Sequence, residues 1–324
     1  MLTAEVIQQT ISKAISELKI PSLPANLYDP IAYTLALGGK RLRPLLVLSA
    51  CDMFGGDLAD AIHPAIGIEL FHNFTLLHDD VMDQAPLRRG KETVYKKWNT
   101  NIALLSGDAM FAMANREVTL THPTAIAAVA GLFNTTAIEV CEGQQYDMDF
   151  ETRNDVSLAE YLEMIRLKTA VLLACSLKTG AIIAGASVDD QQSLYDAGIA
   201  LGMAFQLMDD YLDAFGDEKT FGKTPGGDIM AGKKTFLFLK LLEKSEPERA
   251  RLLKAYSPDS IIEPKEKVEY FRSKFVECSI PVDTRQLINE YFDQAFIKLQ
   301  QPAVAPERKQ VLKDLFNSLV SRQK

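Results

Sequence analysis

An all-α fold, arranged as a large helical bundle, is the fold class that the sequence predicts. Long runs rich in Ala and Leu, such as residues 65–83, 125–143 and 161–185, are apolar at helical spacing. No segment shows the alternating pattern and tight turns of β-hairpins, and no repeat of about 20 to 50 residues is visible. Because these runs are apolar around most of the helix circumference, they need a surrounded central layer, which a large bundle provides.

Helix breakers divide the chain into the expected elements. Pro, Gly and small polar residues interrupt the helical pattern at residues 21–24, 55–56, 84–90, 121–123, 216–234 and 245–247. Most of these segments are expected to be short turns. The segment 216–234 is a long loop rich in Gly and Lys, and long loops in compact domains tend to be functional. No shift in composition marks a domain boundary, so residues 1–324 are expected to form a single domain.

The overall composition excludes several classes of protein. The 324 residues are 47% hydrophobic and 24% charged, with a formal net charge of −8, so nucleic acid is not an expected partner. The four cysteines, Cys51, Cys141, Cys175 and Cys278, lack the spacing of a disulfide scaffold or a zinc site. The N-terminus has no signal-peptide core, and residues 171–186 are too few and too polar to span a bilayer. A cytoplasmic protein without an integral membrane segment is therefore expected.

Two aspartate-rich motifs carry the main functional prediction. In LLHDDVMDQAPLRRG, helical geometry places Asp79 and Asp83 within roughly 40° on one face. Asp209 and Asp213 repeat this spacing in GMAFQLMDDYLDAFGD. One such motif alone is commonly a solvated acidic face, but both motifs here are flanked by apolar residues. Paired carboxylates in that setting favour a cation, and oxygen ligands suit Mg²⁺, which completes its coordination with water and phosphate oxygens.

Basic and polar residues that could bind phosphate accompany both motifs. In LGGKRLRPLLV, basic residues stand just before a helix start, where Pro44 suits the first turn. His72 lies within roughly 20° of Asp79 on the helical wheel, and Gln206 lies within roughly 60° of Asp209. Further candidates are Lys40, Arg41, Arg43, Arg88, Arg89, Lys168, Thr169, Lys223, Lys233 and Lys234. Simple solvation of the basic turn and snorkelling of Lys168 are the alternative readings.

Taken in order, these motifs resemble the trans-isoprenyl diphosphate synthases of the polyprenyl synthetase family. The resemblance comprises GGKRLRP, DDVMD followed by RR, LKTA, and QLMDDYLD followed by GK and GKK. It implies an all-α bundle of the isoprenoid synthase type, in which both aspartate motifs face a central substrate cavity and hold three Mg²⁺ ions on an allylic diphosphate. The expected substrates are isopentenyl diphosphate and dimethylallyl, geranyl or farnesyl diphosphate, and the expected assembly is a homodimer.

The resemblance also implies roles for individual residues. Asp79, Asp83 and Asp209 would ligate metal, while Asp80 and Asp213 would support the metals or bridge to their waters. The allylic diphosphate or its metals would be bound by Arg88, Lys168, Thr169, Gln206, Lys223 and Lys233, and isopentenyl diphosphate by Gly39, Lys40, Arg43, His72 and Arg89. The residues expected to be catalytic are Asp79, Asp83, Lys168, Asp209 and Lys223. The departing diphosphate would be stabilised by metals and cations, the isopentenyl double bond would attack the allylic cation, and the released diphosphate would take up the proton.

Phe74 and Thr75 occupy positions that influence product length in this family. A bulky residue at Phe74 resembles short-chain enzymes, so the expected product is C15 to C20, with C20 favoured. Helical geometry places Phe74 about 140° from Asp79, so its role rests on the resemblance and not on spacing.

Three other classes of protein compete with this interpretation. A class I terpene cyclase also ionises diphosphates, but its second motif normally carries Asn, Ser or Thr, and Glu, where this chain has DDYLD. A non-catalytic subunit of a heteromeric prenyl synthase would commonly have lost acidic residues that are complete here. A di-iron bundle protein would need Glu with ExxH pairs at the acidic sites, where this chain has none.

Overall fold

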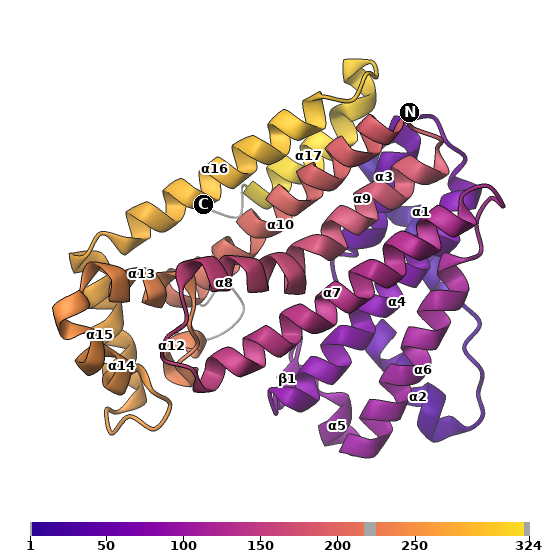
Figure 1. Ribbon diagram of the computed structural model, residues 1–324. Helices are drawn as coiled ribbons and strands as arrows, with labels where there is room; N and C mark the ends of the chain where they lie inside the picture. The colour runs from indigo at the N-terminus through magenta and orange to yellow at the C-terminus, as the bar shows by residue number, and fades with distance from the viewer. Residues whose placement is uncertain (1, 217–224, 321–324) are drawn as a thin grey trace. The chain divides into compact units, whose positions relative to one another are not determined.

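The computed structural model describes residues 2–216 and 225–320, and nearly all of its regular structure is helical (Figure 1). The all-α prediction is therefore confirmed. The described residues form two compact units. Unit 1 contains residues 2–135, 175–195 and 302–314, and unit 2 contains residues 136–174, 196–216, 225–301 and 315–320. A single domain over residues 1–324 stays a prediction.

The N-terminal third of the chain supplies most of unit 1. Its elements are α1 (Ala4–Ser16), α2 (Ala25–Ala36), α3 (Leu42–Met53), α4 (Leu58–Met82), β1 (Leu87–Arg88), β2 (Lys91–Glu92), α5 (Val94–Lys97) and α6 (Thr100–Val118). Helices α4 and α6 run side by side (Figure 1). Gly67 makes this packing possible, because a Cβ there would lie 2.8 Å from the carbonyl oxygen of Ala114. The close contact fixes α4, which carries the first aspartate motif.

The strands β1 and β2 form a two-stranded antiparallel hairpin that the sequence pattern did not predict. Leu87 pairs with Glu92, and Arg88 pairs with Lys91. The intervening residues, Arg89 and Gly90, both have positive φ, 53° and 73°, as the twisted two-residue turns of hairpins require. Two residues per strand are too few to show an alternating pattern, so only the folded chain reveals the hairpin.

The central and C-terminal elements complete both units. They are α7 (Ile126–Thr152), α8 (Leu158–Ile165), the π-helix η1 (Arg166–Ala170), α9 (Val171–Ile183), α10 (Val188–Phe215), α12 (Gly227–Ala231), α13 (Phe236–Lys244), η2 (Glu246–Glu248), α14 (Arg249–Tyr256), α15 (Pro264–Glu277), α16 (Ile280–Gln300), η3 (Pro306–Lys309) and α17 (Gln310–Val320). A capping box between Ser157 and Glu160 starts α8. The short helix α12 lies inside the segment that the sequence suggested was entirely loop.

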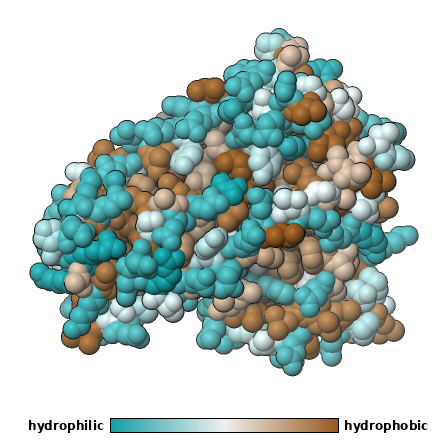
Figure 2. Space-filling model, in the orientation of Figure 1, coloured by the Kyte–Doolittle hydropathy of each residue, from teal (hydrophilic) through white to brown (hydrophobic). Residues whose placement is uncertain are grey.

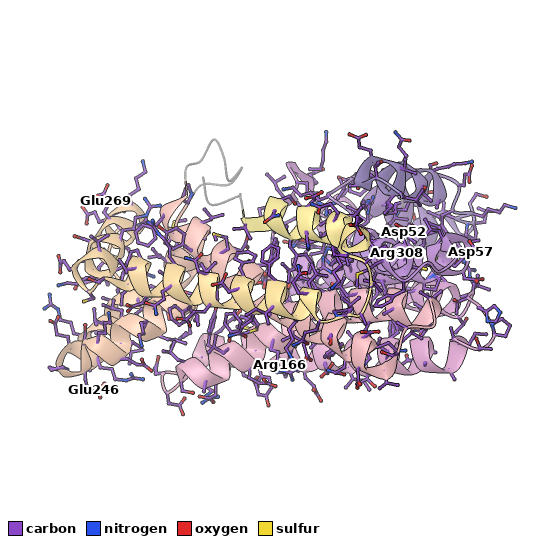
Figure 3. All side chains as sticks on the ribbon, turned by 90° about the horizontal axis from the view of Figure 1, so that it is seen from above. Asp52, Asp57, Arg166, Glu246, Glu269 and Arg308 are labelled. Atoms are coloured by element: carbon purple, nitrogen blue, oxygen red, sulfur yellow. The ribbon has the colours of Figure 1, made fainter. Side chains whose placement is uncertain are left out.

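Residues near the C-terminus pack against the start of the chain within unit 1. Arg308 lies beside Asp52 (Figure 3), and its Nη1 donates to the Asp52 carbonyl oxygen at 3.2 Å, across 256 sequence positions. In the same stretch, the backbone N–H of Ala303 donates to the Asp190 carboxylate at 3.3 Å. These bonds hold residues 302–314 against the N-terminal part of unit 1 and against Asp190.

The surface shown in Figure 2 is mainly hydrophilic, with apolar residues scattered among the polar ones. Among the described residues, no helix is both long enough and apolar enough to cross a membrane. The apolar run at residues 171–186 belongs largely to α9, whose residues Val171 to Leu177 are buried.

Candidate active site

The first aspartate motif lies at the C-terminal end of α4. Asp83 ends the helix and is exposed, and the side chain of Asp79 is 21% exposed. Asp80 is buried between them on the other face, where its Oδ1 accepts from Arg88 Nε at 2.7 Å. Burial raises the pKa of Asp80 to about 6, although Arg88 opposes the shift. The motif therefore presents Asp79 and Asp83 outward, while Asp80 anchors Arg88 and the hairpin that carries it.

A cluster of arginines faces His72 in unit 1. Burial lowers the pKa of His72 well below 6.5, and Arg43, Arg89, Arg88 and Arg41 lower it further, in that order. The imidazole is therefore neutral near pH 7, while the four guanidinium groups remain charged. The sequence pattern pointed to all four arginines and His72 as candidate phosphate ligands, and the fold brings them together from the start of α3, from α4 and from the hairpin.

The Gly38–Gly39 turn packs directly against one of these arginines. Both glycines have positive φ, 73° and 136°. A Cβ on Gly39 would lie 2.6 Å from Nη2 of Arg89, so a larger residue would displace the guanidinium. The turn thus joins the GGKRLRP segment to the RR pair after the first motif, as a shared anion site requires.

Arg43 is the clearest candidate in this cluster for binding an anion. Its Nε is buried and has no hydrogen-bond partner in the structure. Burial lowers its pKa to about 10, opposed by Glu69, so the group stays charged at neutral pH. A buried guanidinium N–H without an acceptor costs free energy, and a diphosphate oxygen would satisfy it.

Arg41, next in the same segment, has a structural partner that the sequence analysis missed. It adopts φ 51° and its Nη1 lies 2.6 Å from Oε1 of Glu69, with both side chains buried. Asn73 donates to the same carboxylate oxygen at 3.0 Å. The only sequence hint was a lone Glu within the apolar run of residues 65–71. Arg41 therefore fixes the basic turn onto α4.

The second motif, on α10 in unit 2, repeats the arrangement of the first. Asp209 is exposed and Asp213 is half-buried, whereas Asp210 is buried. The Asp210 carboxylate accepts from the hydroxyl of Tyr161 and from Gln206 Nε2, the latter at 2.9 Å. Asp213 Oδ2 accepts from the backbone N–H of Asp228 at 2.9 Å. In each motif the second aspartate is the buried one, and the more exposed first and fifth aspartates are the candidate metal ligands.

Asp228 adds a half-buried carboxyl group that the sequence pattern did not reveal. Burial, followed by the charge of Asp213, raises its pKa to about 7, while Lys233 opposes the shift. Lys233 itself belongs to the predicted set, and its backbone N–H donates to the Asp228 carbonyl oxygen at 2.9 Å. Lys234 donates to the Glu151 carbonyl oxygen at 2.8 Å. Lys223 lies outside the described residues.

Lys168 and Thr169 lie in the π-helix η1, between α8 and α9. Lys168 Nζ donates to Oδ2 of Asp147 on α7 at 2.6 Å. Thr169 Oγ1 donates to Oε1 of Gln206 on α10 at 2.9 Å. The anionic partner expected for a lysine in an apolar helix is thus Asp147, and Gln206 links Thr169 to the buried carboxylate of the second motif.

The donor sets of both motifs fit Mg²⁺. Each motif offers two incompletely buried carboxylates one helical turn apart, and Mg²⁺ commonly takes one or two carboxylates together with water and phosphate oxygens. Over residues 2–216 and 225–320, no group of three or more His, Cys, Asp or Glu side chains is arranged to hold a metal by itself. A site built from these motifs would therefore need oxygens from substrate or water.

Phe74 belongs to an aromatic cluster in unit 1. Its ring stacks on Phe111 with centroids 5.3 Å apart, and it contacts Phe71 at 5.5 Å and His78 at 4.7 Å. Phe71 is fully buried. Thr75 uses its hydroxyl to donate to the His72 carbonyl oxygen at 2.8 Å. Phe74 is therefore held in place by neighbouring rings on α4 and α6.

Comparison with known proteins identifies close similarity along most of the chain. The family model described as polyprenyl synthetase matches residues 24–273. A geranylgeranyl diphosphate synthase of Methanosarcina mazei is 39% identical over 236 residues, covering 72% of this chain and 73% of the relative. The geranylgeranyl pyrophosphate synthase of Geoglobus acetivorans is 34% identical over 326 residues, covering 99% of each chain.

Solved structures agree with the sequence relatives. A crystal structure of a geranylgeranyl pyrophosphate synthase superposes with a TM-score of 0.94 at 47% identity, covering 99% of both chains. A polyprenyl synthase from Caulobacter crescentus CB15, crystallised with calcium and isoprenyl diphosphate, superposes with a TM-score of 0.88 at 31% identity and covers 99% of this chain and 96% of that one.

The raised pKa of Asp228 predicts a pH-dependent stability in metal-free protein. The unfolded chain ionises this carboxyl near its ordinary pKa of 3.8, whereas the folded protein retains the proton up to about pH 7. Ionisation of Asp228 therefore lowers the free energy of unfolding as pH rises from about 4 to about 7, and above this range its contribution is constant. We expect the Asp228→Asn variant to show a smaller decrease than the wild type.

Urea unfolding in EDTA, followed by circular dichroism between about pH 4 and pH 8, measures this difference. Asp259→Asn, at an exposed carboxyl in unit 2, is the control. Its free energy of unfolding should decrease with pH as steeply as that of the wild type. Identical pH slopes for Asp228→Asn and the wild type would contradict the raised pKa.

Proposed function

The chain belongs to the polyprenyl synthetase family, and we propose that it is a short-chain trans-prenyltransferase that condenses isopentenyl diphosphate with an allylic diphosphate. The observation that carries this proposal is the anion site in unit 1, where Arg43 has a buried Nε without an acceptor and Arg89 packs on the glycine turn. The same unit carries the outward carboxylates of Asp79 and Asp83. Cationic and metal-binding groups together suit a reaction between two diphosphates.

Isopentenyl diphosphate is proposed to bind the arginine cluster. Lys40, Arg43 and Arg89 would donate charged hydrogen bonds to its phosphate oxygens, while the Gly39 backbone allows close approach. His72 is neutral near pH 7 because burial and the arginines lower its pKa, so it contributes a directional N–H and no further charge. The site therefore holds the substrate that keeps its diphosphate throughout the reaction.

The allylic diphosphate is proposed to bind the polar residues around the two aspartate motifs. Asp79 and Asp83, and likewise Asp209 and Asp213, would hold Mg²⁺, which when bound offsets negative charge on the leaving group. Arg88, Lys168, Thr169, Gln206, Lys223 and Lys233 would orient the diphosphate or support its ligands. Convergence of both motifs on one diphosphate, with three Mg²⁺ ions, remains part of this proposal.

The proposed reaction proceeds through ionisation, condensation and proton loss. As the allylic carbon–oxygen bond breaks, Lys168 and Arg88 stabilise the negative charge that develops on the diphosphate oxygens. The isopentenyl double bond then attacks the allylic carbon, and a new carbon–carbon bond forms. The resulting cation loses a proton to an oxygen of the released diphosphate, which leaves the extended allylic diphosphate as product.

The preferred product is proposed to be the C20 diphosphate. Several relatives are named geranylgeranyl diphosphate synthases, although others are named geranylfarnesyl diphosphate synthases. A C20 product requires a cavity that stops growth early, and the ring of Phe74, held by Phe111 and Phe71, is a rigid group suited to that role.

Replacing Phe74 with Ala is expected to lengthen the product. The change removes the ring that stacks on Phe111 and leaves space for further isoprene units. Reversed-phase chromatography of dephosphorylated products from radiolabelled isopentenyl diphosphate measures the chain length. Val276→Ala, at an exposed apolar side chain on α15, is the control and should give the wild-type product distribution. An unchanged product distribution for Phe74→Ala would rule out a role as cavity floor.

The metal-ligand roles predict large losses of turnover. We expect Asp79→Ala and Asp209→Ala each to reduce kcat by about 100- to 1000-fold, because each change removes stabilisation of the leaving diphosphate. Both side chains are at least partly exposed, so circular dichroism should show an intact helical fold. Asp189→Asn, an exposed aspartate in the first turn of α10, should retain wild-type turnover. Near-normal activity of either alanine variant would contradict the assignment.

A primer assay tests the activity itself and separates it from the alternatives. The wild-type protein with Mg²⁺ and labelled isopentenyl diphosphate is expected to extend dimethylallyl, geranyl and farnesyl diphosphates to products of up to C20. Release of hydrocarbon from farnesyl diphosphate alone would indicate a terpene cyclase. No turnover by folded, metal-loaded protein would indicate a non-catalytic subunit.

We also propose a homodimer in the cytoplasm. Leu104 and Leu105 on α6 are 38% and 60% exposed, and such apolar groups favour burial against a partner. Sedimentation equilibrium should give twice the chain mass of 35.9 kDa. Replacing Leu105 with Glu should shift the mass toward the monomer, and a monomeric wild-type protein would contradict the proposal.

A further inference from the structure

The LKTA segment forms a π-helical turn. Its two polar side chains, Lys168 and Thr169, are hydrogen-bonded to residues of neighbouring helices. The turn η1 spans Arg166–Ala170, and Lys168 and Thr169 occupy its centre. π-helical turns are rare and persist where the surrounding structure stabilises them, often at functional sites. The neighbouring helices α7 and α10, both in unit 2 over this region, provide that surrounding structure.

On the α7 side, three residues at four-residue intervals meet the turn. Glu139 lies 3.7 Å from Arg166, which is labelled in Figure 3, and Asp147 accepts from Lys168. Between them is Gly143, where a Cβ would lie 2.3 Å from the Lys168 backbone nitrogen and 2.7 Å from its Cα. These are backbone atoms, so the clash could be relieved only by moving the turn away from α7.

On the α10 side, the same arrangement recurs with different residues. A Cβ on Gly202 would lie 2.3 Å from the Cα of Ala170. Gln206, one helical turn further on, accepts from Thr169 at 2.9 Å and donates to Asp210 at 2.9 Å. Each helix therefore presents a glycine that admits the turn, followed four residues later by a polar side chain that binds it.

We propose that Gly143 and Gly202 are positioning residues for the reaction. They allow α7 and α10 to approach η1 closely enough for Asp147 to bind Lys168 and for Gln206 to bind Thr169. The inference rests on the proposed function, because it concerns how the groups assigned to the allylic diphosphate are aimed. A methyl group at either glycine would displace Lys168 or Thr169. The residues assigned to isopentenyl diphosphate lie before α3 and on α3, α4 and the hairpin, so the methyl group should leave isopentenyl diphosphate binding unchanged.

The Gly143→Ala variant tests this role. A displacement of about 1 Å in a binding group can lower activity by about 100-fold, so we expect a fall of that size in kcat/KM for farnesyl diphosphate, with an increased KM. The KM for isopentenyl diphosphate should stay at the wild-type value. Gly131→Ala is the matched control on the same helix, because a Cβ there meets no atom within 4 Å. Kinetics for Gly143→Ala equal to those of Gly131→Ala, or equal increases in both KM values, would overturn the inference.

A second pair of variants covers the case in which Gly143→Ala does not fold. Asp147→Asn leaves the space between the helices unchanged and removes the charge that binds Lys168. It should increase the KM for farnesyl diphosphate, and this effect should disappear when Lys168 is replaced by Met, because coupled residues are non-additive. Additive effects of Asp147→Asn and Lys168→Met would overturn the inference. An inactive wild-type protein would instead contradict the proposed function itself.

Discussion

Burying charged groups on apolar helices requires that each be paired, and this requirement organises both aspartate motifs. An uncompensated buried carboxylate is costly, so Asp80 is bound by Arg88 and Asp210 by Tyr161 and Gln206. The second aspartate of each motif is therefore buried and paired, while the first and fifth are more exposed.

The same requirement separates structural arginines from arginines available to a ligand. Arg41 is neutralised by Glu69, which fixes the basic turn on α4. Arg43, two residues later, has a buried Nε that no protein group accepts, and its charge helps to keep His72 neutral. Two arginines of one motif thus differ in their surroundings although their residue type is the same.

Close backbone packing is the second constraint on the candidate site. Gly39 admits Arg89, and Gly143 and Gly202 admit the π-helical turn that carries Lys168 and Thr169. In each case the missing Cβ lets a functional group approach a helix or turn from another part of the chain. The sequence pattern pointed to Gly39 but not to Gly143 or Gly202, because a helical glycine has no pattern that distinguishes close packing from tolerance.

The helical periodicity and the spacing of the aspartates were sufficient to predict an all-α fold, both acidic motifs and the basic residues of unit 1. These features are local, since they depend on residues within a few helical turns. Other features depend on contacts between segments distant in sequence, which periodicity does not encode: the hairpin of residues 87–92, the partners Asp147 and Glu69, and the half-buried Asp228. The sequence by itself determined which residues are candidates for binding metal and phosphate. Only the tertiary structure decided which carboxylates are buried and paired with protein groups, because burial and pairing arise when the helices pack.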